Sequence, residues 1–176
     1  MTIDPANSGA RALADLTAGS VLATVEIAAP AERVFRALTD PRELLQWWGS
    51  SDTYRGHRWD ADFRVGGRWR VEGKSSTGEP YAVFGEFLEI APPRRLVQTW
   101  SYDWDQGRNH PPTKLTYVLD DVPSGTRLTV RHEGFVDRQA CGSHAAGWER
   151  VLGWLEDHME RVVTRGLGSD DAVRRP

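Results

Sequence analysis

The C-terminal part of the chain carries an apolar stripe that repeats with the period of an α-helix. With 100° of rotation per residue, the apolar side chains that follow Trp148 fall within about 60° of it. The stripe consists of Cys141, His144, Trp148, Val151, Leu152, Leu155, Met159, Val162 and Val163. The charged side chains of the segment lie on the opposite side. The sequence therefore predicts a long amphipathic helix, from about residue 138 to 165, that buries one face against an apolar layer.

The pattern before this helix is different. Residues 20–27, SVLATVEI, alternate in the way that is typical of a half-buried strand. Two short helices are predicted next, one opening at Pro30 and one spanning residues 40–49. From residue 58 to 133, alternating runs are separated by Gly, Pro, Ser and Asn, which predicts successive antiparallel strands joined by short loops.

This order of elements predicts an α+β fold. A strongly curved antiparallel sheet of about six or seven strands would wrap around the long C-terminal helix, with two short helices after the first strand. A flat sheet would leave most strand faces bare. We expect residues 1–19 to form a flexible N-terminal arm, with at most a helical turn near 11–16. Residues 20–165 are expected to form one domain, and residues 166–176 a disordered tail.

Composition narrows the classes of function. The chain has 176 residues, a formal net charge of −3 and an isoelectric point of about 6.0, which argues against a general electrostatic interaction with nucleic acid or anionic lipid. It has no apolar run long enough for membrane insertion and no secretory signal, so we expect a cytoplasmic protein. Its single cysteine, Cys141, excludes an internal disulfide. The histidines show no metal-ligand spacing, and we expect neither a metal nor a cofactor.

Several segments of the chain carry a family resemblance when they are taken together. They are VEIAAPAERVFRALTDPRELLQWWG, RVGGRWRVEG, GEFLEIAPPRRLVQTWSY, TKLTYVLDDVPSGTRLTVRHEGF and HAAGWERVLGWLEDHM. They resemble the SRPBCC superfamily, which is also called START-like or helix-grip. The closest resemblance is to the homologues of the heat-shock-protein ATPase activator C-terminal domain, and it covers about residues 20–163. The combination of Gly66-Gly67, the Pro-Pro-Arg-Arg-Leu corner and Gly147-Trp148 makes it specific.

The resemblance implies a helix-grip fold with a cavity between the curved sheet and the C-terminal helix. Such cavities often bind hydrophobic or aromatic molecules. The superfamily includes lipid carriers, hormone receptors, polyketide cyclases, dioxygenase ligand domains and chaperone activators, so the fold does not imply one activity. The iron-binding His-Asp set and the Rieske domain of the dioxygenases are not found in this sequence.

Aromatic and histidine side chains on the predicted inner faces are the candidates for a ligand-binding cavity. The predicted cavity residues are Trp48, Trp69, Trp100, Tyr117, His132, His144, Trp148 and Leu152. Each can equally be ordinary core packing, and strand parity does not fix the direction of Trp100 and Tyr102. No catalytic residue is assigned.

Four further features give expectations about this region. Gly147 is expected to mark a close approach by a strand or a ring, since glycine inside a helix costs about 1 kcal/mol relative to alanine. Of the adjacent Trp47 and Trp48, one is expected to seal the core and the other to lie at the cavity mouth. The loop of residues 103–112 is either a solvated turn or a gate. Cys141 and His144 share a helix face, but a zinc site or a nucleophilic pair would need further groups.

The predicted function is binding of a small hydrophobic or aromatic molecule beneath the long helix. One alternative is a cyclase- or hydratase-like enzyme in which His132 or His144 moves protons on a polyketide-like substrate. The other is a co-chaperone-like module that stimulates an ATPase through its surface. A chaperone is therefore also a candidate partner. A second copy of the chain is another.

Overall fold

A single curved antiparallel sheet and three helices make up the described part of the chain. The computed structural model describes residues 9–103 and 111–170, and side chains as far as residue 164. In the described residues the sheet has nine strands in the order β1-β2-β9-β8-β7-β6-β5-β4-β3. The elements are β1 (Arg11–Asp15), β2 (Ser20–Ile27), α1 (Ala31–Thr39), α2 (Pro41–Trp47), β3 (Gly49–Ser50), β4 (Tyr54–Ala61), β5 (Arg68–Ser75), β6 (Pro80–Ala91), β7 (Arg95–Tyr102), β8 (Thr113–Val122), β9 (Gly125–Glu133) and α3 (Arg138–Asp170).

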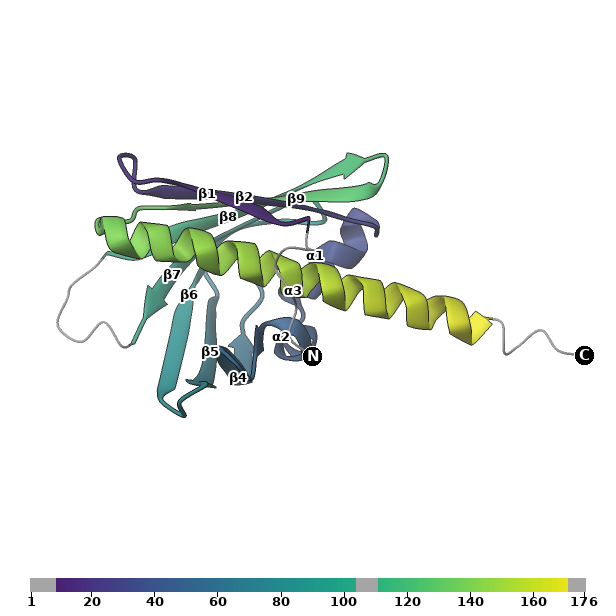
Figure 1. Ribbon diagram of the computed structural model, residues 1–176, viewed down its shortest axis with the longest axis horizontal. Helices are drawn as coiled ribbons and strands as arrows, with labels where there is room; N and C mark the ends of the chain where they lie inside the picture. Colours follow the sequence, from purple (N-terminus) through teal and green to yellow (C-terminus); the bar gives the residue numbers. More distant parts are fainter. Residues whose placement is uncertain (1–8, 104–110, 171–176) are drawn as a thin grey trace, which may run out of the picture.

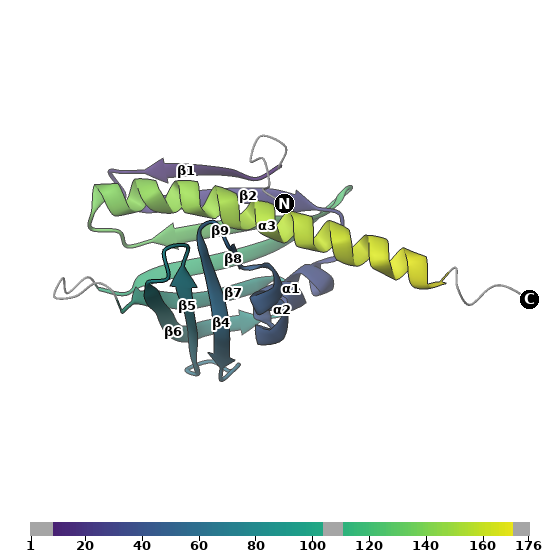
Figure 2. The same ribbon diagram turned by 60° about the horizontal axis from the view of Figure 1, so that its bottom comes forward.

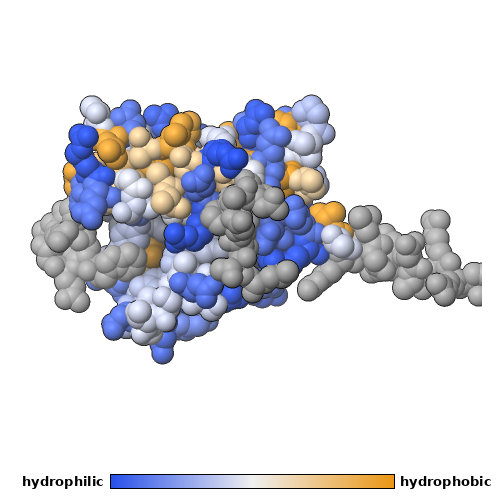
Figure 3. All heavy atoms as spheres, in the orientation of Figure 1, coloured by the Kyte–Doolittle hydropathy of each residue, from blue (hydrophilic) through white to orange (hydrophobic). Residues whose placement is uncertain are grey.

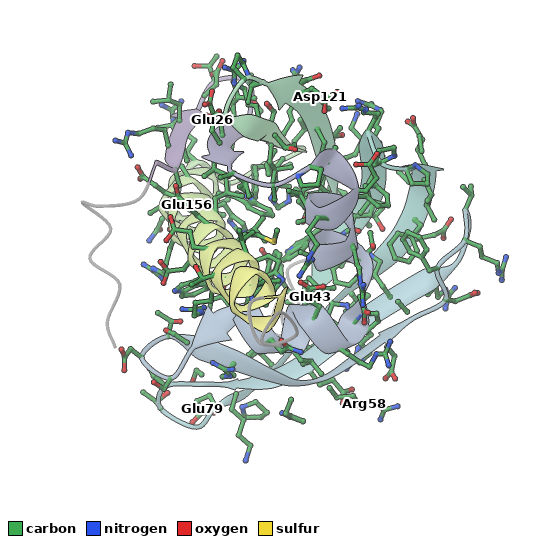
Figure 4. All side chains as sticks on the ribbon, turned by 90° about the vertical axis from the view of Figure 1, so that its right-hand side faces the viewer. Glu26, Glu43, Arg58, Glu79, Asp121 and Glu156 are labelled. Atoms are coloured by element: carbon green, nitrogen blue, oxygen red, sulfur yellow. The ribbon has the colours of Figure 1, made fainter. Side chains whose placement is uncertain are left out.

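The sheet bends around the helices. Figure 1 shows α3 running along the inside of the layer formed by β1, β2 and β9, with β4, β5 and β6 turned away from that layer. The view along α3 in Figure 4 shows the strands curving around α3 and the two short helices. The predicted α+β helix-grip fold is therefore confirmed. Among the described helices, none combines the length and the apolar character that crossing a lipid bilayer requires.

The sheet has more strands than the six or seven that the sequence predicts. The two additions lie at its edges, where β1 has five residues and β3 has two. The interpretation of residues 11–16 as a mobile arm with a helical turn was wrong, because β1 pairs with β2 from Arg11↔Thr24 to Asp15↔Ser20. Its alternation was hard to recognise because four of its five residues are small or charged. Residues 1–8 lie outside the described residues.

The C-terminal boundary also needs correction. The helix does not end near residue 165 but continues to Asp170, so part of the predicted disordered tail is helical. Figure 1 shows this end of α3 projecting past the sheet. Val163 is 39% exposed rather than buried, because the sheet no longer covers the helix there. Residues 171–176 lie outside the described residues.

The short helices are fastened to each other by polar groups. Asp40 caps α2, since its carboxylate accepts a hydrogen bond from the Arg42 N–H at 2.9 Å. The Trp47 indole donates to the Ala37 carbonyl of α1 at 3.0 Å. Trp47 and Trp48 are both buried, and Trp48 lines the small cavity described below. The position of one of them at a cavity mouth stays a prediction.

Glu43 joins all three helices. Its Oε1 accepts hydrogen bonds from the Arg33 guanidinium of α1 at 2.5 Å and from His158 Nε2 of α3 at 2.8 Å. Figure 4 shows Glu43 between α3 and the short helices. Burial raises the pKa of this carboxyl, but the hydrogen bonds from Arg33 and His158 outweigh burial, and the pKa lies below its ordinary value. The ionised carboxylate is therefore the form that holds the helices together.

Replacing Glu43 tests this connection. We expect Glu43→Ala to lower the free energy of unfolding by about 3 kcal/mol, because it leaves Arg33 partly buried without its counter-ion. Urea denaturation at pH 7 measures the change. The matched control is Asp121→Ala, which breaks an exposed ion pair with Arg94 and should cost under about 1 kcal/mol. Equal losses for the two variants would show that Glu43 contributes no more than a surface pair.

Candidate functional site

Seven rings meet in one largely buried group, six of them from five strands and helices and one from the link between α2 and β3. We call it the aromatic cluster, and it consists of Trp48, Trp69, Trp100, Tyr117, His132, His144 and Trp148. Its ring centroids are 5.2 Å apart for Trp69 and Trp100, and 5.9 Å for Trp48 and Trp100. The separation is 5.8 Å for Trp48 and Trp148. These distances are typical of favourable edge-to-face and tilted aromatic contacts.

The structure thus brings the predicted cavity residues together. Leu152 is buried in the same core, and His144 is the one member of the predicted set that is only half-buried. Strand alternation directs the rings of β5, β8 and β9 inward, as the sequence predicts. On β7, Trp100 also points inward, alongside Leu96 and Gln98. Tyr102 follows on the same face and reaches α3, which settles the direction that parity left open.

His132 lies at the centre of a directed chain of hydrogen bonds. The Trp148 indole can only donate, and it donates to His132 Nδ1 at 3.1 Å. His132 Nε2 must therefore carry the proton of the neutral ring, and it donates to Thr113 Oγ1 at 2.7 Å. The Thr113 hydroxyl donates in turn to the Trp100 carbonyl at 3.1 Å. The chain links α3, β9, β8 and β7, and it fixes the tautomer of His132.

His144 is held in the opposite tautomer. Its Nδ1 donates to the carbonyl of Ala140, four residues earlier in α3, at 2.8 Å. Its Nε2 is thereby left as an acceptor, and it accepts a hydrogen bond from the Tyr102 hydroxyl. The two imidazole centroids are 5.3 Å apart, edge to face. Both histidines therefore have both ring nitrogens engaged by protein groups.

Burial keeps both histidines neutral. It lowers the pKa of His132 well below the ordinary value, and the neighbouring His144 lowers it further. Burial also lowers the pKa of His144, against a smaller opposite effect of its bond to Ala140. A charged form of either ring would have to be created in an apolar environment. The arrangement thus favours a fixed polar wall over a pair of groups that exchange protons.

A small cavity lies beside the aromatic cluster. Its volume is about 20 Å³, which is room for about one water molecule. Trp48, Trp69, Trp100 and Tyr117 contribute to its wall, together with Gln98 and residues of α1, α2, β4 and β6. The expected position was wrong in one respect, because this cavity lies between the sheet and the two short helices rather than beneath α3. Trp48 fills the space between it and Trp148.

Two indole N–H groups of residues that line this cavity have no hydrogen bond of good geometry. They belong to Trp69 and Trp100, and both are shielded from solvent. Trp69 Nε1 lies over Gly85 of β6, where an added Cβ would come within 2.8 Å of it. The strand glycine thus makes room for the ring. A buried donor without an acceptor costs about 1–3 kcal/mol, so the cavity wall would gain from a guest that carries an acceptor.

The structure supports no binding role for Gly147 or Cys141. An added Cβ on Gly147 would meet nothing within 4 Å, so the expected close approach at this glycine was wrong. The Cys141 thiol is directed at the Asp15 and Ser20 carbonyls, at 3.8 Å and 3.5 Å. Burial raises its pKa, so the thiol stays protonated. Within residues 9–103 and 111–170, no group of three or more His, Cys, Asp or Glu side chains could hold a metal ion. Most of the loop of residues 103–112 lies outside the described residues.

Several residues that form or support this region were not recognised from the sequence. Thr113 begins β8 after a pair of prolines, and nothing in its pattern marks it as the acceptor for His132. Gly85 could have been recognised, since an isolated glycine inside a strand often marks close packing. The pairing of Glu43 with His158 spans 115 positions, and no local pattern indicates it.

A curved antiparallel sheet around a long C-terminal helix, with buried aromatic and polar groups between them, defines a protein of the helix-grip class. The family of activator of Hsp90 ATPase homolog 1-like proteins matches residues 28–160, and the chain belongs to this family. A comparison with curated proteins finds no match.

Solved structures from several bacteria share the fold. Protein CV1439 from Chromobacterium violaceum is 26% identical, with a TM-score of 0.68 over 79% of this chain and 96% of that chain. Protein Ms6760 from Mycobacterium smegmatis is 23% identical, with a TM-score of 0.71 over 86% of this chain and 94% of that chain. A protein from Arthrobacter aurescens is 20% identical, with a TM-score of 0.73 over 85% and 91%. These similarities concern the fold.

The neutral state of His132 gives a pH prediction. Its pKa is lower in the folded chain than the value of about 6.5 in an unfolded chain, so below that pH the unfolded state binds a proton that the folded state does not. We expect the free energy of unfolding to fall as the pH decreases from 7 to 5, by at most about 1.4 kcal/mol per pH unit for each buried histidine.

His132→Gln is the matched variant, because its amide can still accept and donate but does not titrate. Urea denaturation at several pH values should give a shallower slope for this variant than for the original chain. An unchanged slope would show that His132 takes up its proton equally in both states.

Proposed function

We propose that the chain binds a small, mostly apolar aromatic molecule that carries one hydrogen-bond acceptor. The observation that carries this proposal is a pair of tryptophans, Trp69 and Trp100, that line a cavity and whose buried indole N–H groups have no hydrogen bond of good geometry. Family membership supports a ligand-binding module in general terms. The chemistry of the wall then selects the kind of ligand.

The guest would be held by three kinds of interaction. Its acceptor would take up an indole N–H, which removes the cost of an unpaired buried donor. Its ring would stack among the surrounding tryptophans, at about 0.5–1.5 kcal/mol for each contact. Its remaining surface would be removed from water, at about 25 cal/mol per Å² of apolar area.

A guest of this size requires the aromatic cluster to open. Trp48 is suited to move, because it is the single residue between the end of α2 at Trp47 and the start of β3 at Gly49. The next residue, Gly49, has φ = 99°, and an added Cβ there would lie 2.2 Å from the Tyr54 carbonyl. A guest that displaces the Trp48 ring would take its place between Trp100 and Trp148. The binding site would then extend beneath α3.

Binding fits the geometry better than proton transfer. Each ring nitrogen of His132 and His144 is already engaged by a protein group. A general acid or base must reach the substrate with an available proton or lone pair. A cyclase- or hydratase-like reaction would therefore require these hydrogen bonds to break first.

A pair of ligands of equal shape tests the proposal. Acetophenone and α-methylstyrene differ only in a carbonyl oxygen in place of a methylene group. We expect acetophenone to bind more tightly in calorimetric titrations, because only its oxygen can accept an indole N–H. Trp69→Phe or Trp100→Phe should weaken acetophenone binding about 2- to 10-fold, which corresponds to one hydrogen bond, and leave α-methylstyrene binding nearly unchanged.

Trp154→Phe is the control, since Trp154 is buried against Tyr54 outside the aromatic cluster. Equal affinity for both compounds, or binding of neither, would contradict the proposal. If the chain instead stimulated an Hsp90-type ATPase and took up no aromatic ligand, the co-chaperone alternative would be favoured.

A further inference from the structure

The strand β1 forms one edge of the sheet. Among the residues that the structure describes, it is the first strand in the sheet order, and the strand it pairs with is β2. Figure 2 shows β1 along the outer border of the sheet, next to α3. The outer side of an edge strand can pair with a further strand of suitable shape.

The outer face of this edge is apolar. Leu13 is 76% exposed, and its register partner on β2, Leu22, is 49% exposed. In Figure 3, which has the orientation of Figure 1, apolar surface gathers over the region of β1. The alternation of β1 places Leu13 on the same face as the exposed side chains of Arg11 and Asp15.

The order of residues in β1 is self-complementary. Read as Arg-Ala-Leu-Ala-Asp, the strand has opposite charges two positions on either side of Leu13. If a second copy paired with it in antiparallel orientation, centred on Leu13, Arg11 would face Asp15 of the partner subunit. Asp15 would likewise face Arg11 of the partner subunit, and the two leucines would face each other. A parallel pair in the same register would set like charges opposite each other, which is unfavourable.

We propose that two copies of the chain associate through β1 about a twofold axis, and that their sheets join into one. The occupant of this edge is a second copy because the charge pattern matches itself in a single antiparallel register. Leu22, Leu13 and their counterparts in the second copy form a continuous apolar row on the outer face. This inference is independent of the ligand-binding proposal, because β1 contributes no residue to the cavity wall.

The existing contacts of the two charged residues are compatible with this pairing. Arg11 Nη1 donates to the Ala10 carbonyl, and Asp15 Oδ1 accepts from the backbone N–H groups of Thr17 and Ala18. A guanidinium carries five N–H donors, and a carboxylate can accept about four hydrogen bonds. Each side chain can thus keep its contact within the chain and add one across the interface.

Two charge-reversal variants of the chain, Arg11→Asp and Asp15→Arg, test the proposal. Sedimentation equilibrium should give about twice the chain mass of 19.7 kDa for the original protein. Arg11→Asp alone, and Asp15→Arg alone, should each give a monomer, because like charges then face each other. An equimolar mixture of the two variants should recover the dimer as a heterodimer, since every opposing pair is again of opposite charge. Near-ultraviolet circular dichroism from the eight tryptophans checks that each variant is folded.

The same measurement contains the results that would overturn the proposal. They are a monomer of the original chain at all concentrations up to about 1 mM, a dimer that survives Arg11→Asp, or a mixture that stays monomeric. A dimer that survives would place the interface on another surface of the molecule.

A second measurement does not depend on Asp15, whose replacement could disturb the β1–β2 turn. Leu13→Cys should form an intermolecular disulfide rapidly under mild oxidation, because the two copies of this position face each other across the axis. Leu22→Cys is the control, since it lies on the same face but one strand away from the axis. The native Cys141 is buried and stays out of the reaction. Equal cross-linking of the two variants would contradict the proposed register.

Discussion

The hydrogen-bond chain through His132 is the constraint on which the interior of this protein depends. It begins at the Trp148 indole on α3, passes through His132 and Thr113, and ends at the Trp100 carbonyl on β7. Three hydrogen bonds thereby link four elements. Each group in the chain donates to the next one, which holds His132 in one tautomer. Such a network specifies a unique arrangement because each buried polar group has its partner. It also explains how a histidine with no exposed surface is compatible with a stable core.

Four of the buried tryptophans are of two kinds when their N–H groups are compared. Those of Trp47 and Trp148 donate to protein acceptors and fix the packing of the helices. Those of Trp69 and Trp100 make no such bond and stand together in the wall of the small cavity. The hydrogen-bonded indoles lie on helices, and the indoles without a hydrogen bond lie on strands. The site proposed for a ligand is therefore bordered by helices whose packing is fixed by hydrogen bonds. Trp48, Trp100 and Tyr117 line the cavity and also contact the ring of Trp148.

The sequence was sufficient for the architecture and for the inward direction of several aromatic side chains. The two-residue alternation of the strands directs Trp69, Tyr117 and His132 inward, and the 3.6-residue repeat of the helix directs Trp148 inward. It was insufficient for β1, whose small residues give a weak pattern, and for the position of the cavity. The cavity depends on how Trp48 fills the interior, and side-chain packing of that kind has no periodic signature. The close approach expected at Gly147 was wrong for a related reason, because the low helix propensity of glycine does not show whether a neighbouring group lies beside it.

The most direct test of the central claim follows the indole N–H groups themselves. Nitrogen-15 spectra of the chain resolve the tryptophan side-chain signals, which single Trp→Phe variants assign. When acetophenone is added, the account predicts a downfield proton shift for Trp69 or Trp100, and no comparable shift when α-methylstyrene is added. The Trp47 signal should remain in place with both compounds, because its donor is already bonded to Ala37. Equal shifts with both compounds, or shifts confined to tryptophans outside the cavity wall, would contradict the account.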